Sequence, residues 1–299
     1  MNLFNYILFW ICIIGLCLGS FFNVVILRSL SNESIVFPAS KCPKCNHKLY
    51  FWHNIPVLSY ILLRGKCYFC KEKISIQYPI VELSTMVLFG LTFLKFGISY
   101  YTLLILASVS CFIIMTVTDL KERVADCNIA IGLGILGILY NGLTWGWQGV
   151  LNSVLGLLVG ALILEIIARL GYLFVKTRAM GEADTFVAGS LGAVFGMPAV
   201  LWILLYGFIA SMVFIIPMFF YNQFKNNNRQ TCILGILFTL SVLVFQTVWQ
   251  NYYTMSILLI TGILLAISVM KSARFEENRS YLPYIPALFA GMLIYLVIA

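Results

Sequence analysis

Long apolar runs recur along this chain of 299 residues and limit what it can fold into. A run of about 20 apolar residues crosses a hydrocarbon core of about 30 Å as an α-helix. Lipid offers the backbone no hydrogen-bond partners, so nearly all of these segments are expected to be helical. The predicted fold class is therefore an all-α polytopic membrane protein, a helical bundle of about ten spans. The expected spans are Leu3–Leu27, Pro79–Phe96, Tyr101–Thr118, Cys127–Trp145, Val150–Val175, Thr185–Gly196, Ala199–Tyr221, Cys232–Val248, Met255–Met270 and Leu282–Ala299.

The sixth run is short and is expected either to form a half-helix or to extend beyond these bounds. The chain is 62% hydrophobic and only 10% charged, a balance that excludes a soluble domain. The first run is expected to be a retained membrane span rather than a cleaved signal peptide, because no basic residue precedes it and no small-residue cleavage pattern follows it.

The basic residues alternate between connections and so predict the topology. Eight of the 19 Lys and Arg lie in the long segment 28–78. Every second connection after it is also basic, and the intervening connections carry neither Lys nor Arg. This positive-inside pattern places segment 28–78 in the cytoplasm and both termini outside. The net charge of +8 is thus explained by topology, and no nucleic-acid partner is expected.

Two of the three aspartates are expected to meet at the cytoplasmic side of the membrane. Asp119 ends the third run, which enters from outside, and Asp184 precedes the sixth run, which leaves from inside. Carboxylates placed at membrane depth are costly and mark functional sites. The third aspartate, Asp126, is expected to be the N-cap of the fourth span rather than a catalytic group.

Segment 28–78 contains two C-x-x-C pairs, which predict a four-thiolate zinc site. Each pair supplies two sulfurs from one tight turn, and four thiolates leave no open position for water, so the metal would be structural. Two disulfides are the alternative, which the cytoplasmic placement disfavours. The two histidines, His47 and His53, are expected to have surface or packing roles, since the site is already complete. The expected ligands are Cys42, Cys45, Cys67 and Cys70.

Five stretches in register resemble the type IV prepilin peptidases, bifunctional leader peptidases and N-methyltransferases of the GxGD aspartyl protease type. The first motif, GSFFNVVILRSL, precedes the double C-x-x-C segment, which itself contains NIPVLSY. YPIVELST follows, and then come TDLKERVAD and MGEADTFVAGSLGAVFG around the two aspartates. The resemblance extends to about Tyr221 and resumes near the C-terminus at LPYIPALFAG.

The resemblance implies a function and a location. Asp119 and Asp184 match the family's catalytic pair, and Gly181, Glu182 and Ala183 match the motif loop beside the substrate. The implied substrates are prepilins or pseudopilins, cut after a glycine at the end of a basic leader. S-adenosylmethionine is the implied methyl donor, and the cytoplasmic segment with Glu82 at its edge is the suggested contributor to its site. The implied location is the bacterial inner membrane, in contact with lipid, with the zinc segment and the active site on the cytoplasmic side and with pilus or secretion machinery as further partners.

Three departures from the family pattern concern its motifs and its length. Ala183 replaces the second glycine of G-x-G-D, so a positive φ is not expected there. Ala125 stands where the family has a proline, and that motif is one residue shorter. Two extra spans, at about 232–270, interrupt the C-terminal part. The expected divisions are a first span at 1–27, the zinc domain at 28–78 and a membrane peptidase domain at 79–299.

Two functions outside the peptidase class fit parts of the same sequence. Paired carboxylates also couple ions in transporters, although transporter sites lie near the bilayer midplane rather than at one interface. A non-catalytic scaffold of a pilus or secretion machine would use the zinc segment for docking. The aspartyl peptidase is the hypothesis that the motifs favour.

Overall fold

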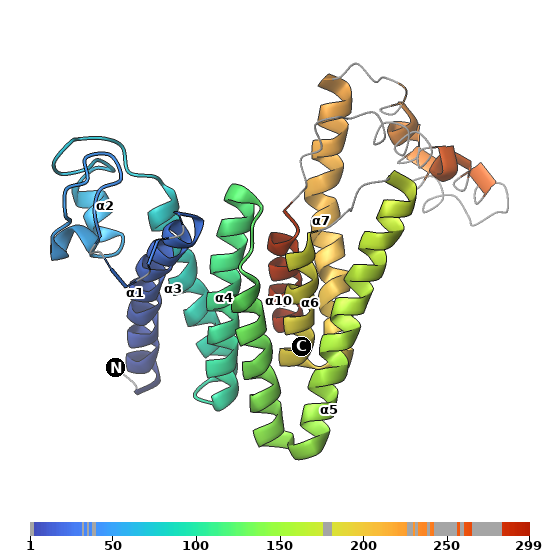
Figure 1. Cartoon of the computed structure of the whole chain (residues 1–299), viewed down its shortest axis with the longest axis horizontal. Coiled ribbons are helices and arrows are strands. Elements are labelled where there is room, and N and C mark those ends of the chain that lie inside the picture. The colour runs from blue at the N-terminus through green and yellow to red at the C-terminus, as the bar shows by residue number, and fades with distance from the viewer. Residues whose placement is uncertain are drawn as a thin grey trace. The chain divides into compact units, whose positions relative to one another are not determined.

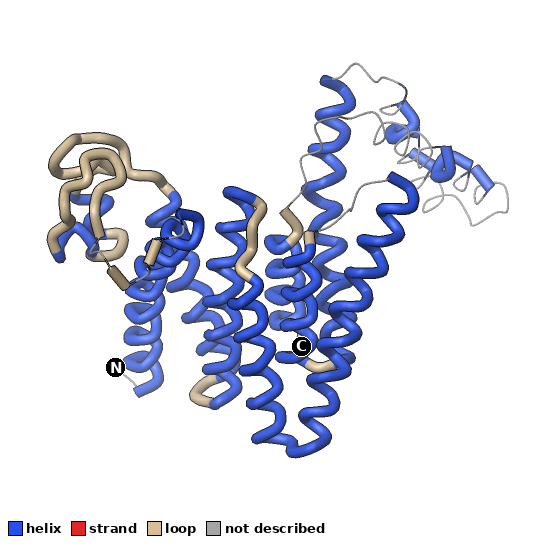
Figure 2. Tube along the Cα trace, viewed as in Figure 1, coloured by secondary structure: helices blue, strands red, loops and turns tan. Residues whose placement is uncertain are grey.

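A computed structural model describes the chain as a set of helices and one loop-rich module, residues 40–76 (Figures 1 and 2). The described residues are 3–31, 33–34, 36–37, 40–175, 181–225, 230, 233–237, 240–241, 256–257, 260–264 and 283–299. They contain two isolated β-bridges but no strand. The main elements are α1 (Leu3–Ser31), η1 (Phe51–Asn54), α2 (Leu58–Leu62), α3 (Gln77–Phe96), α4 (Tyr100–Glu122), α5 (Cys127–Val175), α6 (Glu182–Phe195), α7 (Met197–Lys225) and α10 (Ile285–Ile298).

The helical membrane fold is confirmed. Among the described residues, four helices are long and apolar enough to cross a membrane, namely α1, α3, α4 and residues Cys127–Leu170 of α5. Two shorter apolar helices, Met197–Val213 and Ile285–Ile298, lie within α7 and α10. Most of the extra pair of spans expected at 232–270 lies outside the described residues. The chain divides into two compact units, one of Met1–Gly160 with Phe186–Val200 and one of Ala161–Thr185 with Leu201–Ala299.

In the first unit, α1 and α3 approach each other closely through glycine. A Cβ atom at Gly19 would lie 2.7 Å from the Glu82 Cα atom, and one at Gly15 would lie 2.9 Å from the Met86 Cα atom. Small residues of this kind let membrane helices pack backbone against backbone. This pairing places the start of α3, to which the loop-rich module is joined, beside the end of α1.

The fourth and fifth expected spans are the two arms of α5. At Gly146 the backbone has φ 60° and ψ −145°, which is not helical, and the chain folds back on itself there (Figure 1). A positive φ of this kind favours glycine, which has no Cβ to clash. The expected connection at 146–149 is therefore a sharp kink at one residue rather than a loop.

Helix α6 is held against both arms of α5 by close backbone contacts. A Cβ atom at Gly137 would lie 2.7 Å from the Val194 Cα atom, and one at Gly192 would overlap the carbonyl oxygen of Gly156. The Asn141 side chain donates to the Ala193 and Val194 carbonyl oxygens at 3.2 and 3.1 Å. These carbonyls belong to the last turn of α6 and lack partners within the helix, so α5 fixes where α6 ends.

A single methyl group at Gly192 is expected to destabilise this packing. Gly192→Ala would force α5 and α6 apart, and overpacking of this kind costs roughly 3 kcal/mol. Gly132→Ala is the matched control, because Gly132 lies on an open face of α5 with nothing within 4 Å of its added Cβ. Thermal unfolding in detergent should show a clearly lower unfolding temperature for the first variant and no decrease for the second. Equal unfolding temperatures would contradict the observed contact.

In the second unit, α7 and α10 cross through a second pair of glycines. A Cβ atom at Gly291 would lie 2.9 Å from the Gly207 Cα atom. Tyr284 precedes α10 and packs edge to face against Phe208 of α7, with ring centroids 6.2 Å apart. The C-terminal helix is thus a packed member of this unit, with Leu288 and Met292 fully buried.

Candidate active site and metal centre

Asp184 lies inside the first turn of α6 and takes part in its N-terminal cap. Its Oδ2 atom accepts a hydrogen bond from the Gly181 backbone N–H at 3.0 Å. Gly181 precedes the helix and Asp184 is its third residue, so this is the backward half of a capping box. The sixth run extends beyond its expected bounds at this end, because the helix begins at Glu182. The Asp184 side chain is consequently held in place, and the residue is only 7% exposed.

The other residues of the motif loop follow from the same helix start. Ala183 is helical and is not among the residues with positive φ, so the alanine in place of glycine fits without strain. Glu182 is exposed, in agreement with a solvated or substrate-contacting role. The preceding connection, 176–180, lies outside the described residues.

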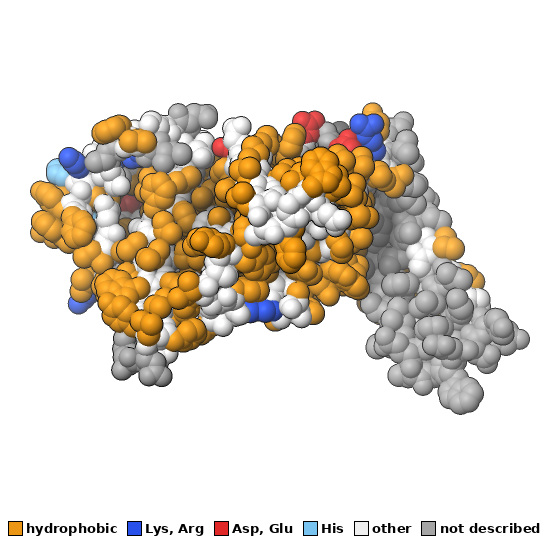
Figure 3. All heavy atoms as spheres, turned by 90° about the horizontal axis from the view of Figure 1, so that it is seen from below, with side chains coloured by type: hydrophobic (Ala, Val, Ile, Leu, Met, Phe, Trp, Pro, Cys, Tyr) orange, Lys and Arg blue, Asp and Glu red, His pale blue; other side chains and the backbone are white. Residues whose placement is uncertain are grey.

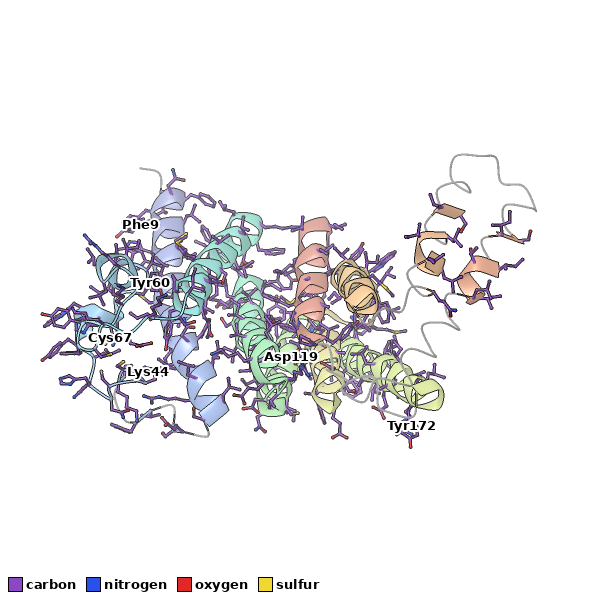
Figure 4. All side chains as sticks on the ribbon, turned by 90° about the horizontal axis from the view of Figure 1, so that it is seen from above. Phe9, Lys44, Tyr60, Cys67, Asp119 and Tyr172 are labelled. Carbon is purple, nitrogen blue, oxygen red and sulfur yellow. The ribbon has the colours of Figure 1, made fainter. Side chains whose placement is uncertain are left out.

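Asp119 lies in the last turn of α4 and is 6% exposed (Figure 4). The helix continues to Glu122, so Asp119 is within the helix rather than after it. Arg123 ends the helix in the left-handed conformation, with φ 57°, and its backbone N–H donates to the Asp119 carbonyl oxygen at 2.9 Å. Asp119 and Asp184 belong to different units, each is described within its own unit, and their pairing stays a prediction.

Asp126 has the capping role that the sequence predicted. Its Oδ1 atom accepts from the Asn128 backbone N–H at 2.9 Å, and its carbonyl oxygen accepts from Ile129 at 3.1 Å. Helix α5 begins at the next residue, Cys127. This carboxylate therefore accepts a hydrogen bond from a backbone N–H in the first turn of α5 and has a structural role as the N-cap.

The four cysteines of the loop-rich module converge as a metal site requires. Their sulfur atoms all lie within 4.8 Å of one another, and the sulfurs of Cys42 and Cys70 are 4.0 Å apart. Zinc–sulfur bonds of about 2.3 Å in a tetrahedron imply sulfur separations of roughly 3.8 Å. A disulfide would need about 2.05 Å, and none of these cysteines is bonded to another. The donor set thus fits a structural zinc ion.

The two C-x-x-C turns have the same backbone design. In the first turn, the Asn46 N–H donates to the Cys42 carbonyl oxygen at 2.9 Å, and in the second the Lys71 N–H donates to that of Cys67 at 3.0 Å. Asn46 and Lys71 both have positive φ, at 56° and 60°. The Cys70 backbone N–H also bonds the Cys67 sulfur and lowers the pKa of that thiol to about 7. Near neutral pH this sulfur is already partly the thiolate that binds metal.

The two histidines pack in an aromatic cluster of the module and not in the four-cysteine group. The His47 ring lies 4.0 Å from the Phe69 ring, centroid to centroid. His53 contacts Tyr68 at 5.2 Å and Phe69 at 5.7 Å. These contacts agree with the packing roles expected from the sequence.

Comparisons with known proteins agree with these features. Residues 13–96 match the bacterial peptidase A24 N-terminal domain, and residues 105–216 match the type IV leader peptidase family. A prepilin leader peptidase/N-methyltransferase of Neisseria gonorrhoeae is 35% identical over 62% of this chain and 73% of its own length. The chain belongs to the type IV leader peptidase family.

Further relatives carry the same name. That of Myxococcus xanthus is 34% identical over 67% of this chain, which spans only 60% of its length. That of Stutzerimonas stutzeri is 32% identical over 63% of this chain and 74% of its own length. No solved structure shows a significant match. The match to the leader peptidase family contains both aspartates, and the match to the N-terminal domain contains all four cysteines.

Within this family member, Glu82 connects the loop-rich module to α3. Its Oε2 atom accepts from the Val57 backbone N–H at 2.8 Å, and the residue is 5% exposed. The carboxylate is thus buried and bonded to the chain itself, and its suggested contribution to the methyl-donor site stays a prediction. Val57 has φ 60°, a strained value for a β-branched residue.

Loss of the Glu82 carboxylate is expected to release the Val57 turn. Glu82→Ala removes the acceptor of a charge-assisted hydrogen bond, and such bonds contribute about 1.5–3 kcal/mol. Amide hydrogen exchange around residues 55–63 should become roughly tenfold to hundredfold faster. Ser84→Ala is the control, because the Ser84 hydroxyl bonds only carbonyls of its own helix in the described structure. Unchanged exchange in Glu82→Ala would show that the bond does not hold the turn.

Proposed function

We propose that this chain is a membrane aspartyl endopeptidase that removes the basic leader of type IV prepilins or pseudopilins after a glycine and then methylates the new N-terminus. The observation that carries the proposal is the pair of buried aspartates, 6% and 7% exposed, in the two motifs of the leader peptidase family. The names of the relatives support the substrate class and both activities.

Asp119 and Asp184 are proposed to act as one catalytic pair. Two carboxylates held close together share a proton, so one serves as a base while the other serves as an acid. The helix ends favour one arrangement, since the N-terminal end of a helix stabilises negative charge and the C-terminal end opposes it. Asp184 lies at the start of α6 and Asp119 at the end of α4. Asp184 is therefore the proposed base, and Asp119 the proposed acid.

The proposed reaction needs no covalent intermediate. The Asp184 carboxylate takes a proton from a water molecule, and that water attacks the carbonyl carbon of the scissile peptide. Asp119 donates its proton to the carbonyl oxygen as the tetrahedral intermediate forms. When the intermediate collapses, the proton held by Asp184 passes to the departing amine, and Asp119 recovers its own.

The motif loop is proposed to contact the substrate. Gly181 and Glu182 are both exposed at the start of α6, beside the proposed base. The exposed Glu182 carboxylate has the charge needed to attract a basic leader. The cytoplasmic side of the inner membrane is the proposed location, where the leader is reached by water while the mature part of the substrate stays anchored as a helix. Membrane lipid and the pilus or secretion machinery are the further proposed partners.

Zinc and S-adenosylmethionine have separate proposed roles. Zinc, bound by the four cysteines, would hold the two turns of the module together, and it has no open position for chemistry. S-adenosylmethionine supplies the methyl group when bound. The 28–78 segment remains the proposed zinc domain, followed by the peptidase domain from residue 79, with the extra pair at about 232–270 inserted into it.

The decisive test of this function is the intact mass of a prepilin after incubation with the purified chain. With S-adenosylmethionine present, the product should lose its leader and gain one methyl group; without it, the leader alone should be lost. Leader loss without methylation in both conditions would limit the chain to a peptidase. An unchanged prepilin in the presence of a folded, zinc-loaded enzyme would contradict the proposal and favour a transporter or scaffold role.

A further inference from the structure

Helix α2 of the zinc module presents an apolar face that no described part of the protein covers. Leu58, Ile61 and Leu62 are exposed, and Leu62 is 79% exposed. Their spacing of three and four residues places them on one side of the helix. Tyr60 lies on the other side, with its hydroxyl 3.1 Å from the position that a Cβ on Gly65 would take. The helix thus turns the Tyr60 ring toward Gly65 and its aliphatic side chains outward.

The bond between Glu82 and Val57 fixes the position of this face along the axis of α3. Glu82 is five residues into α3, which corresponds to about 7.5 Å along the helix. Its side chain leans back toward the helix start, so the Val57 N–H is held beside the first turns of α3. Helix α2 begins at the next residue. Figure 1 accordingly shows α2 beside the ends of α1 and α3 rather than stacked beyond them.

The sequence indicates that the first turns of α3 lie at the edge of the membrane. The apolar run starts at Pro79, directly after Gln77 and Tyr78, and tyrosine is typical of the lipid–water interface. Ile76 and Ile80 are both exposed and lie on one face of this helix start. The lipid-facing surface of α3 therefore continues into the module at the level of α2.

Aromatic and basic side chains accompany the apolar face. Phe51 and Trp52 are exposed next to it, and Trp52 stacks on Tyr50 with ring centroids 5.1 Å apart. Figure 3 views the molecule from below Figure 1, and hydrophobic side chains cover much of the part of the module that is visible at its left edge. Between residues 40 and 78 the only acidic residue is Glu72. The basic residues of that range are all exposed and are Lys41, Lys44, Lys48, Arg64, Lys66, Lys71 and Lys73.

We propose that the zinc module docks on the surface of the bilayer that α1 and α3 span, with α2 lying in the headgroup region. Leu58, Ile61 and Leu62 enter the apolar side of the interface, as in other interfacial helices. The surrounding Lys and Arg contact the phosphates of anionic lipids, which attract basic segments close to a membrane. Docking gives the module a fixed height beside the bundle, with the Glu82 bond as its protein anchor. It does not depend on the proposed peptidase activity.

A tryptophan introduced at Leu62 tests the docking directly. Leu62→Trp in the full chain would be placed in bilayers that contain anionic phospholipid and a lipid brominated at a shallow acyl position. Its fluorescence, after subtraction of the unsubstituted protein, should be blue-shifted and quenched severalfold. Glu72→Trp is the matched control, because Glu72 is exposed on the second C-x-x-C turn and outside the α2 face. Its emission should stay red-shifted and should respond to aqueous iodide instead.

The alternatives give different results. A tryptophan at position 62 that is unquenched by bromolipid and quenched by iodide as strongly as that at position 72 would overturn the proposal. Protection from iodide that arises only on addition of a prepilin would assign the face to substrate and would also overturn it. A shift of the Leu62→Trp emission toward the red when zwitterionic lipid replaces anionic lipid would support the electrostatic part. Zinc content and prepilin cleavage, measured in parallel, identify any variant that misfolds.

Discussion

Asp119→Asn and Asp184→Asn are each expected to abolish leader cleavage while the protein stays folded. Either change removes a group that gives or takes a proton, and such groups contribute roughly 10²- to 10⁴-fold to a rate. Asparagine has the shape of aspartate, so the buried sites keep their packing. At position 184 the amide oxygen can still accept the Gly181 N–H that begins α6. The rate of cleavage of a prepilin, followed by gel or mass, is the measurement.

Asp126→Asn is the matched control for both variants. It makes the same chemical change close to Asp119, at a residue whose carboxylate caps α5. Asparagine is as good an N-cap as aspartate, so cleavage should stay near the wild-type rate. Wild-type cleavage by either Asp119→Asn or Asp184→Asn would exclude that residue from the chemistry. A loss in Asp126→Asn as large as in the other two would show that the loop, and not the proposed pair, is what the variants test.

Cys42→Ser is expected to release the metal and unfold the zinc module. In its described residues the module has only two short elements, η1 and α2, and the four-cysteine cluster joins its two turns. Structural zinc contributes on the order of 10 kcal/mol in small domains that fold around it. Zinc content should fall from one ion per chain to none, and amides between residues 40 and 76 should exchange rapidly.

Cys127→Ser provides the comparison for the zinc prediction. Cys127 is a free cysteine at the start of α5, outside the cluster. Its replacement should leave the zinc content and the amide exchange unchanged. Addition of a prepilin should also leave both unchanged. Retention of one zinc by Cys42→Ser, with the slow exchange of the parent protein, would show that the four cysteines do not form the metal site. The same conclusion would follow if Cys42→Ser bound metal that a chelator could not remove and recovered the exchange pattern of the parent protein.

The fold and the site differ in how far the sequence predicted them. The apolar runs predicted α1, α3 and α4 to within a few residues, because the thickness of the membrane sets the length of the apolar run in each spanning helix. The family and the cysteine cluster were likewise predicted and confirmed, since their residues sit in compact motifs. The zinc ion itself, and the roles of the two aspartates, stay proposals.

Other features depended on contacts that a single sequence does not display. The sixth run was expected either to form a half-helix or to extend beyond Thr185–Gly196, and only the structure shows that α6 begins at Glu182, with the Gly181–Asp184 bond at its start. The bond between the Glu82 carboxylate and Val57, 25 residues away, likewise appears only in the structure. The glycines at 137, 156 and 192 lie in apolar runs where any small residue looks equivalent, and their close approach appears only in the packed helices.

Cross-linking between positions 119 and 184 tests most directly the claim that the two aspartates form one site. A variant with Asp119→Cys and Asp184→Cys would be treated with a short bifunctional thiol reagent, and the linked peptides would be identified by mass spectrometry. The account predicts an abundant 119–184 link that is absent from each single variant. If both cysteines react with a monofunctional reagent but never link to each other, the two aspartates do not share a site, and the proposed mechanism is contradicted.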